Sequence, residues 1–361
     1  MISLSRRTVA AALLCLLPAA APGEPVAGQK HAAMAIDEGM FVDINGSPQW
    51  ITVRGQDRRN PVLLWLHGGP GVPMSGQAPL FAAWEKDYTI VQWDQPGGGA
   101  TYAKNGPSGI GEMSISRYTR DAITVAEWAR RHLGSRKLIV IGTSWGTLLG
   151  LQLASKRPDL VAAYVGAAQF VSGPKGARLG YDEALKAARE RNDRTAIEEL
   201  EKVGPPPYTR FEDFLVRQKY VNPPFQKPSP AEAAAMAEAG KLLQGSPPPG
   251  AKYVATGLPE YDGVEAFLSA QRSMFAPTAQ YEAESLGLSF KVPMFFFQGA
   301  DDRNTPTALV RDYFARIKAP RKRLEIVPDA GHLVVMFHDR LLSFLNREVR
   351  PVALNAASPR P

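Results

Sequence analysis

Short runs of mostly apolar residues recur along the first half of the chain, separated by stretches of helical character. The runs cover residues 62–66, 89–93, 138–141 and 161–165. They predict strands buried on both faces, because only a covered strand lacks a polar side. Helices are predicted over 117–133, with Ser116 as the cap, and over 148–156, before a proline. This alternation predicts an α/β fold with a mostly parallel, doubly wound sheet.

The pattern changes on either side of this region. Before it, residues 41–44 and 50–53 flank the turn sequence Asn45-Gly46-Ser47-Pro48 and predict two strands. After it, residues 171–288 are rich in Ala, Glu and Lys, are interrupted by proline clusters, and predict a helical insertion. The strand and helix alternation then returns, with strands over 294–297 and 324–327, a helix near 308–317, and a closing helix after His332.

These changes divide the chain into five parts. We expect a signal peptide over 1–23, a first part of the core over 24–170, a helical cap over 171–288, a second part of the core over 289–350 and a loose tail over 351–361.

The N-terminus has the pattern of an export signal. Ser5-Arg6-Arg7 supplies positive charge, residues 9–17 form a short apolar run, and Ala19-Ala20-Ala21 supplies the small residues of a cleavage site. The paired arginines partly match a twin-arginine signal, and an ordinary secretory signal is the alternative. Because the apolar run is too short to span a bilayer, we expect an exported protein without stable membrane insertion.

Composition and charge narrow the function classes further. The 361 residues are 45% hydrophobic and 21% charged, as in globular proteins. The net charge of +7 is spread along the chain without a Lys/Arg block, which argues against a nucleic-acid partner. The single cysteine, Cys15, lies in the expected signal peptide. Disulfides, zinc-thiolate sites and cysteine nucleophiles are therefore excluded from the mature chain.

The sequence Gly142-Thr143-Ser144-Trp145-Gly146 fits the G-x-S-x-G pattern of a nucleophilic serine. It follows a predicted strand and opens a predicted helix, which is the context that this pattern requires. Glycines there permit a tight turn that exposes the serine hydroxyl, and the helix N-terminus favours a developing negative charge.

A second glycine-rich turn, His67-Gly68-Gly69-Pro70-Gly71, follows the strand predicted over 62–66. Backbone N–H groups in such a turn suit the second half of an oxyanion hole. We expect His67 itself to be a structural hydrogen-bonding residue.

A base and an acid complete the expected site. His332 follows the last predicted strand, where a hydrolase base belongs, whereas His31, His67, His132 and His338 lie in other contexts; His338 is expected on the surface of the closing helix. The acid must lie between Ser144 and His332 in the chain. Asp301 and Asp302 both follow the strand over 294–297, and only one of them can orient the base.

Together these motifs resemble the proline iminopeptidase-like serine peptidases of the α/β-hydrolase fold. The shared features, in the family's order, are HGGPG at 67–71, WDQ at 93–95, GTSWG at 142–146, G-x-x-D-x-x-T-P at 299–306 and AGH at 330–332. The resemblance implies Asp302 as the acid and the N–H groups of Gly69 and Trp145 as oxyanion donors, with no metal or cofactor. The chain departs from the family at Pro96, where an arginine is usual, and residues 171–288 carry no recognisable cap motif.

The predicted activity is cleavage of an acyl bond by Ser144, His332 and Asp302. The resemblance favours an aminopeptidase that acts on small peptides, and an esterase or lactonase acting on small esters with the same three residues is the alternative. A serine at position 144 disfavours an epoxide hydrolase or dehalogenase, which need a carboxylate there. The presence of all three residues disfavours a binding protein. The sequence does not predict an oligomeric state.

Overall fold

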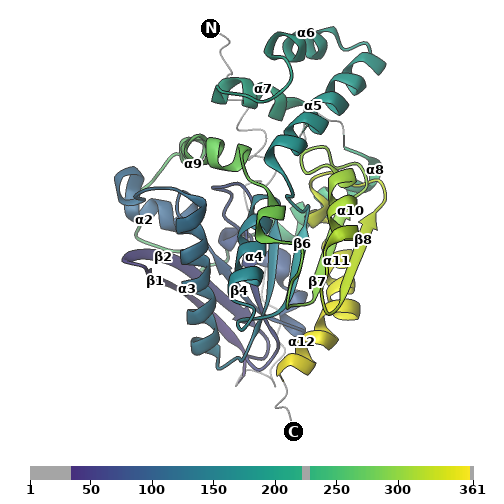
Figure 1. Cartoon of the computed structure of the whole chain (residues 1–361). Coiled ribbons are helices and arrows are strands. Elements are labelled where there is room, and N and C mark those ends of the chain that lie inside the picture. Colours follow the sequence, from purple (N-terminus) through teal and green to yellow (C-terminus); the bar gives the residue numbers. More distant parts are fainter. Residues whose placement is uncertain (1–33, 222–227, 358–361) are drawn as a thin grey trace.

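The computed structural model describes residues 34–221 and 228–357. The predicted signal peptide lies outside the described residues. An eight-stranded sheet forms the centre of the molecule, in the order β1-β2-β4-β3-β5-β6-β7-β8. Its strands are β1 Ile36–Ile44, β2 Ser47–Gly55, β3 Val62–Leu66, β4 Thr89–Trp93, β5 Leu138–Thr143, β6 Val161–Ala167, β7 Met294–Gly299 and β8 Lys322–Val327. The first two strands are antiparallel to their neighbours and the other six run parallel, which confirms the predicted doubly wound sheet (Figure 1).

Apolar side chains cover both faces of this sheet. On one face, alternate residues of β3 and β5 pack with α3 (Ile115–Leu133), α4 (Trp145–Lys156) and α10 (Thr307–Arg316). On the other, the intervening residues pack with the short helices η1 (Ser75–Phe81) and η2 (Trp84–Lys86) and with the C-terminal helices. The two clusters explain why these strands are mostly apolar: every residue of β3, β4 and β5 is buried.

The C-terminal helices differ from the expected loose tail. Helix α11 (His338–Phe344) continues through a π-helical turn, η5 (Leu345–Val349), into α12 (Arg350–Ala357). Ala353 is buried in the same apolar cluster as Phe344 and Val349. Packing of this small side chain against the core therefore extends the helix through most of the predicted tail.

Helix α3 begins slightly earlier than predicted. Ser114 accepts the N–H of Arg117 and caps the helix, in place of Ser116. Its end is as expected, because Gly134 adopts the left-handed conformation that a C-terminal cap requires.

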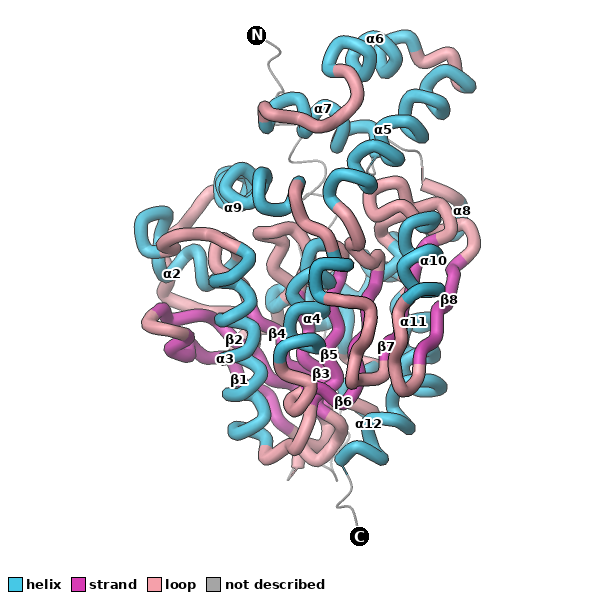
Figure 2. Tube along the Cα trace, viewed as in Figure 1, coloured by secondary structure: helices cyan, strands magenta, loops and turns pink. Residues whose placement is uncertain are grey.

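The insertion between β6 and β7 is helical, as predicted. Its helices are α5 (Gly173–Glu190), α6 (Arg194–Val203), α7 (Phe211–Val221), α8 (Pro230–Leu243) and α9 (Gly263–Ala279), with the short η3 (Ala283–Leu286) before β7. Helices α5 to α7 project above the sheet with a small apolar core of their own, and α9 lies below them, nearer the sheet (Figures 1 and 2). We expected the whole of 171–288 to form the helical cap. Helix α8 instead packs on the body of the molecule, because Ala239 and Leu243 are buried in the main core.

Within the described ranges, no helix is both long enough and apolar enough to cross a membrane.

Candidate active site

Ser144 occupies the sharp turn between β5 and α4. Its backbone has φ 51° and ψ −121°, a region that residues with a Cβ rarely adopt. The flanking glycines make the turn possible. A Cβ on Gly146 would overlap the carbonyl oxygens of Leu66 and His67, and one on Gly142 would overlap the backbone of Gly146 and Thr147. The predicted turn is therefore present, with its serine at the carboxyl end of a central strand.

His332 lies in the loop after β8, and Asp302 lies in the loop after β7. The two loops are joined by a hydrogen bond from the Asp301 N–H to the Ala330 carbonyl, 2.9 Å long. They also pack closely, since a Cβ on Gly299 would overlap the carbonyls of Ala330 and Gly331. The His332 and Asp302 loops therefore lie side by side at one edge of the sheet, although 30 positions separate the two residues in the chain.

The structure brings Ser144, His332 and Asp302 together in one hydrogen-bonded series. Ser144 Oγ lies 2.9 Å from His332 Nε2, and His332 Nδ1 lies 3.0 Å from Asp302 Oδ2. The Asp302 side chain is fully buried and the His332 side chain is 11% exposed. Such an arrangement can transfer a proton from the serine while a buried carboxylate orients the imidazole.

Asp302, not Asp301, is the aspartate in contact with His332. Its second oxygen, Oδ1, accepts the N–H groups of Asn304 and Thr305, and Oδ2 also accepts the Thr305 hydroxyl. Burial by itself raises the pKa of this carboxyl, but the neighbouring His332 and the Thr305 hydrogen bonds outweigh burial and hold the pKa below its usual value. Asp302 is therefore kept as an anion facing the imidazole.

Two residues at this site escaped the sequence analysis. Asn304 Nδ2 lies 3.1 Å from His332 Nε2, beside the Ser144 hydroxyl. Gln298, at the end of β7, donates to Asp302 Oδ2 and to the Thr305 carbonyl. Both lie within or next to the motif over 299–306, but a motif alone does not show which of its variable positions face the histidine.

The glycine turn after β3 lies directly against the serine. A Cβ on Gly68 would lie 3.3 Å from Ser144 Cβ, and Gly69 has φ 120°. Trp145 is the first residue of α4, so its N–H belongs to the helix turn that has no intrahelical acceptor. Among the described residues, neither Gly69 nor Trp145 donates its N–H to a protein acceptor. Both groups are thus available to a ligand.

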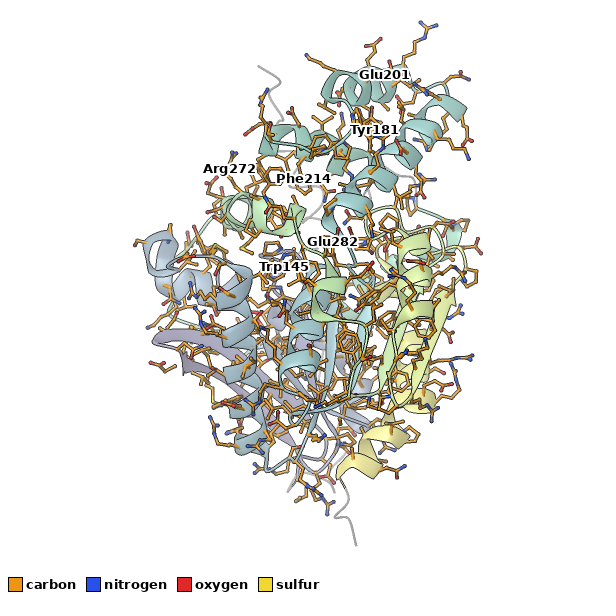
Figure 3. All side chains as sticks on the ribbon, viewed as in Figure 1. Trp145, Tyr181, Glu201, Phe214, Arg272 and Glu282 are labelled. Carbon is orange, nitrogen blue, oxygen red and sulfur yellow. The ribbon has the colours of Figure 1, made fainter. Side chains whose placement is uncertain are left out.

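Helix α9 covers the same turn from above. Gln271 Nε2 donates to the Pro70 carbonyl at 3.0 Å, and Trp145 Nε1 donates to Thr278 Oγ1 at 3.0 Å. Figure 3 shows Trp145 below Phe214 and Arg272, which belong to the helices above it. The Trp145 indole and the glycine turn are therefore both hydrogen-bonded to helix α9 of the insertion.

His67 is structural, as expected. Its Nε2 accepts the N–H of Gln95, and its Nδ1 contacts the Gly68 carbonyl. Burial lowers the pKa of His67 to about 4, so the ring stays neutral and joins β3 to β4.

The predicted surface position of His338 is wrong. His338 is buried against the rings of Phe81 and Trp84, because α11 turns its first residue towards the core.

The region around Pro96 lacks the arginine that is usual in the family. Tyr118 donates its hydroxyl to the Pro96 carbonyl. The buried Asp94 accepts the Ser75 hydroxyl and the Ala100 N–H. Burial raises the pKa of Asp94 to about 6. Hydrogen bonds from hydroxyl and backbone groups thus hold this turn.

The acidic residues of the insertion have different surroundings. Glu212 pairs with Arg272, Glu282 accepts the Ser172 hydroxyl, and Glu284 pairs with Arg316. Glu183 on α5 is half-buried and interacts electrostatically with Arg303 and Asp302. Burial raises the pKa of Glu183, and Arg303 opposes this effect. Of these four carboxylates, Glu183 is the one that interacts electrostatically with residues of the Asp302 loop.

Among the residues in the described ranges, no group of three or more His, Cys, Asp or Glu could hold a metal ion.

Comparison with known proteins identifies relatives of this chain. It is 26% identical over 293 residues to the probable aminopeptidase YbaC of Bacillus subtilis, which covers 81% of this chain and 89% of that protein. A probable proline iminopeptidase of Streptomyces coelicolor is 32% identical over 130 residues, or 36% of this chain and 39% of that protein.

A similar fold is found in the crystal structure of a proline iminopeptidase-related protein from Thermus thermophilus. The TM-score is 0.60 at 18% identity, with 90% of this chain and all of that chain covered. The family model for the α/β-hydrolase fold matches residues 61–339, which include Ser144, Asp302 and His332. The chain therefore belongs to the α/β-hydrolase family and is a hydrolase similar to proteins that are named as a probable aminopeptidase and a probable proline iminopeptidase.

Proposed function

We propose that this protein is an exported serine hydrolase, an aminopeptidase of the proline iminopeptidase type that releases N-terminal residues from short peptides. The observation that carries the proposal is the hydrogen-bonded series from Ser144 through His332 to Asp302. The names of the relatives support a peptidase, and the N-terminal sequence pattern supports export.

In the proposed mechanism, Ser144 Oγ attacks the substrate carbonyl while His332 Nε2 accepts its proton. Asp302 accepts the Nδ1–H and stabilises the imidazolium that forms. The N–H groups of Gly69 and Trp145 donate to the oxyanion, at the N-terminus of α4. The protonated His332 then gives its proton to the leaving amine, and water hydrolyses the acyl-enzyme by the same steps. No step requires a metal ion or cofactor.

The position of the insertion supports the proposed substrate class. Helices α5 to α7 and α9 stand above the carboxyl edge of the parallel strands, where ligands of open α/β sheets bind (Figure 1). A roof at this place excludes long polypeptides and favours short ones. A half-buried carboxylate such as Glu183 can attract an α-ammonium group more strongly than an exposed one.

Two comparisons test the activity. Ser144→Ala should lower kcat by on the order of 10³-fold or more without loss of the fold, because the three residues act as a unit. A prolyl reporter with a free amine should be cleaved at least about tenfold faster than its N-acetylated form, since one charged contact contributes about 1.5–3 kcal/mol. Near-normal turnover by Ser144→Ala would end the serine-hydrolase proposal. Faster cleavage of the blocked compound or of an acetate ester would favour the esterase alternative.

Export has its own test. A reporter fused to residues 1–30 should leave the cytoplasm, and retention of the fusion inside the cell would contradict the proposal. Changing Arg6 and Arg7 to lysine should block a twin-arginine route and spare an ordinary secretory one.

A further inference from the structure

Helix α8 begins against the loop that carries His332. Glu232, in its first turn, accepts the N–H of Gly331 with Oε1 at 2.7 Å. Gly331 is the residue immediately before His332. The other carboxylate oxygen accepts the N–H of Ser229 at 3.1 Å, and the Ser229 hydroxyl accepts the Glu232 N–H at 3.0 Å. One carboxylate therefore caps its own helix and binds the histidine loop.

Ser229 makes a second contact with the same loop. Its hydroxyl donates to the Asp329 carbonyl at 2.5 Å. Asp329 has φ 54°, a left-handed conformation that costs energy for a residue with a side chain. The loop before His332 is thus held at two backbone positions, Asp329 and Gly331, by one capping pair.

The helix that carries this pair is fixed to the body of the molecule. Ala239 and Leu243 of α8 are buried in the core cluster that also contains Phe81 and Val334. Val334 opens the short helix η4 (Val334–Met336), two residues after His332. The buried residues of α5 to α7 form a separate apolar cluster. The contacts to the histidine loop therefore come from an anchored helix and not from the projecting part of the insertion.

Glu232 also fits the loop sterically. A Cβ on Gly331 would lie 3.0 Å from Glu232 Oε1, so the carboxylate packs directly against the glycine Cα. A hydrogen bond that a carboxylate accepts from a backbone N–H is charge-assisted and stronger than a neutral one. The loop conformation at His332 therefore depends on a side chain from another element.

We propose that Glu232 is a positioning residue, which holds the His332 loop so that the imidazole contacts Ser144 and Asp302 at the same time. The inference rests on the proposed function, because it assigns His332 the role of the base. A displacement of about 1 Å in a reacting group can lower the rate about 10²-fold. Loss of the Glu232 contact should thus lower turnover and leave substrate affinity nearly unchanged.

The test compares three variants of the full-length mature protein. Glu232→Ala should lower kcat by about 10- to 100-fold with KM within about twofold of the unaltered protein. Glu232→Gln keeps an oxygen that can accept the Gly331 N–H and should recover most of the lost kcat. Glu238→Ala is the control, since Glu238 is an exposed residue of the same helix that pairs with Lys241, and it should leave kcat unchanged.

Backbone hydrogen exchange supplies a readout that does not depend on activity. The Gly331 amide should exchange faster in Glu232→Ala than in Glu232→Gln or the control, and the rest of the core should keep its protection. If Glu232→Ala fails to fold, Glu232→Asp provides the comparison: it keeps a carboxylate at the helix N-terminus, but its shorter side chain does not reach the Gly331 N–H, so it should lower kcat and speed Gly331 exchange in the same way.

The outcomes separate the two proposals. Unchanged kcat in Glu232→Ala, an equal loss in Glu238→Ala, or a rise in KM at constant kcat would overturn the positioning role; the last result would place Glu232 in contact with substrate. Full turnover by Ser144→Ala would instead overturn the proposed function and with it the positioning role. The Gly331 exchange rates would then still show whether Glu232 fixes the loop.

Discussion

At the scale of single residues, two neighbouring aspartates have different environments. Asp302 is buried and accepts hydrogen bonds from His332 and Thr305, whereas the side chain of Asp301 is exposed. The residue motifs left both open, and the family resemblance favoured Asp302. The structure agrees with that resemblance, because only Asp302 contacts the imidazole.

This difference predicts unequal effects of the same substitution. Asp302→Asn should lower kcat by about 10³- to 10⁴-fold, since a neutral amide cannot stabilise the imidazolium and favours the wrong tautomer. Asp301→Asn should change kcat by less than about threefold, because it alters an exposed side chain. Steady-state kinetics on a prolyl or ester reporter will measure both. A larger loss at Asp301 would show that the two loops are arranged differently in solution.

At the scale of elements, the site depends on how closely α4 approaches β3. The backbone of Gly146 lies against the carbonyls of Leu66 and His67, where no side chain fits. The turn that presents Ser144 therefore requires glycine at this position for packing. Gly240 on α8 is a contrasting helical glycine, since a Cβ there would meet nothing within 4 Å.

The two glycines predict stability changes of opposite sign. Gly146→Ala should lower the free energy of unfolding by about 2–4 kcal/mol, because the backbone of β3 cannot move aside cheaply. Gly240→Ala should raise it by about 0.5–1 kcal/mol, as alanine replaces glycine in a helix without a clash. Urea unfolding followed by circular dichroism will measure both values. A stable Gly146→Ala variant would contradict the close approach of α4 to β3.

At the scale of the whole molecule, buried histidines connect stability to pH. Burial lowers the pKa of both His67 and His338 to about 4, compared with 6.5 for a free side chain. Neither ring nitrogen of His338 has a hydrogen-bond partner among the described residues. Each of these histidines therefore binds fewer protons in the folded protein than in the unfolded chain between these two pH values, whereas the buried carboxyls of Asp94 and Glu85, whose pKa values are raised to about 6 and about 7, bind more.

The resulting prediction concerns the part of the pH dependence of stability that the two histidines contribute. Because the unfolded chain takes up protons at these two positions first, the stabilisation that each neutral histidine contributes is complete above about pH 6.5 and falls by about 3 kcal/mol as the pH drops towards 4. His338→Phe should fit among the surrounding aromatic rings and remove the share of His338, so that the free energy of unfolding of the unaltered protein falls by about 3 kcal/mol relative to that of the variant over this range. Urea midpoints measured from about pH 7 to 4 will show it. Parallel curves for the two proteins would contradict the neutral, buried state of His338.

Much of the core could be predicted from local pattern. The bounds of β3 and β4 match the apolar runs over 62–66 and 89–93, since strands covered on both faces leave a continuous signal. The turn at Ser144 and the loop at His332 were also predicted, because their glycines and their places after strands are local features. The signal peptide stays a prediction, as residues 1–23 lie outside the described part of the chain.

The sequence by itself determined the alternation of strands and helices, the turn at Ser144 and the edge of the sheet at which His332 lies. These features depend on periodicity and on backbone requirements that a few neighbouring residues express. Only the tertiary structure decided that α8 packs on the core, that His338 is buried and that Glu232 and Asn304 reach the His332 loop. Such contacts join segments far apart in the chain. They depend on which helix faces pack against one another in three dimensions, and the local sequence pattern does not specify this.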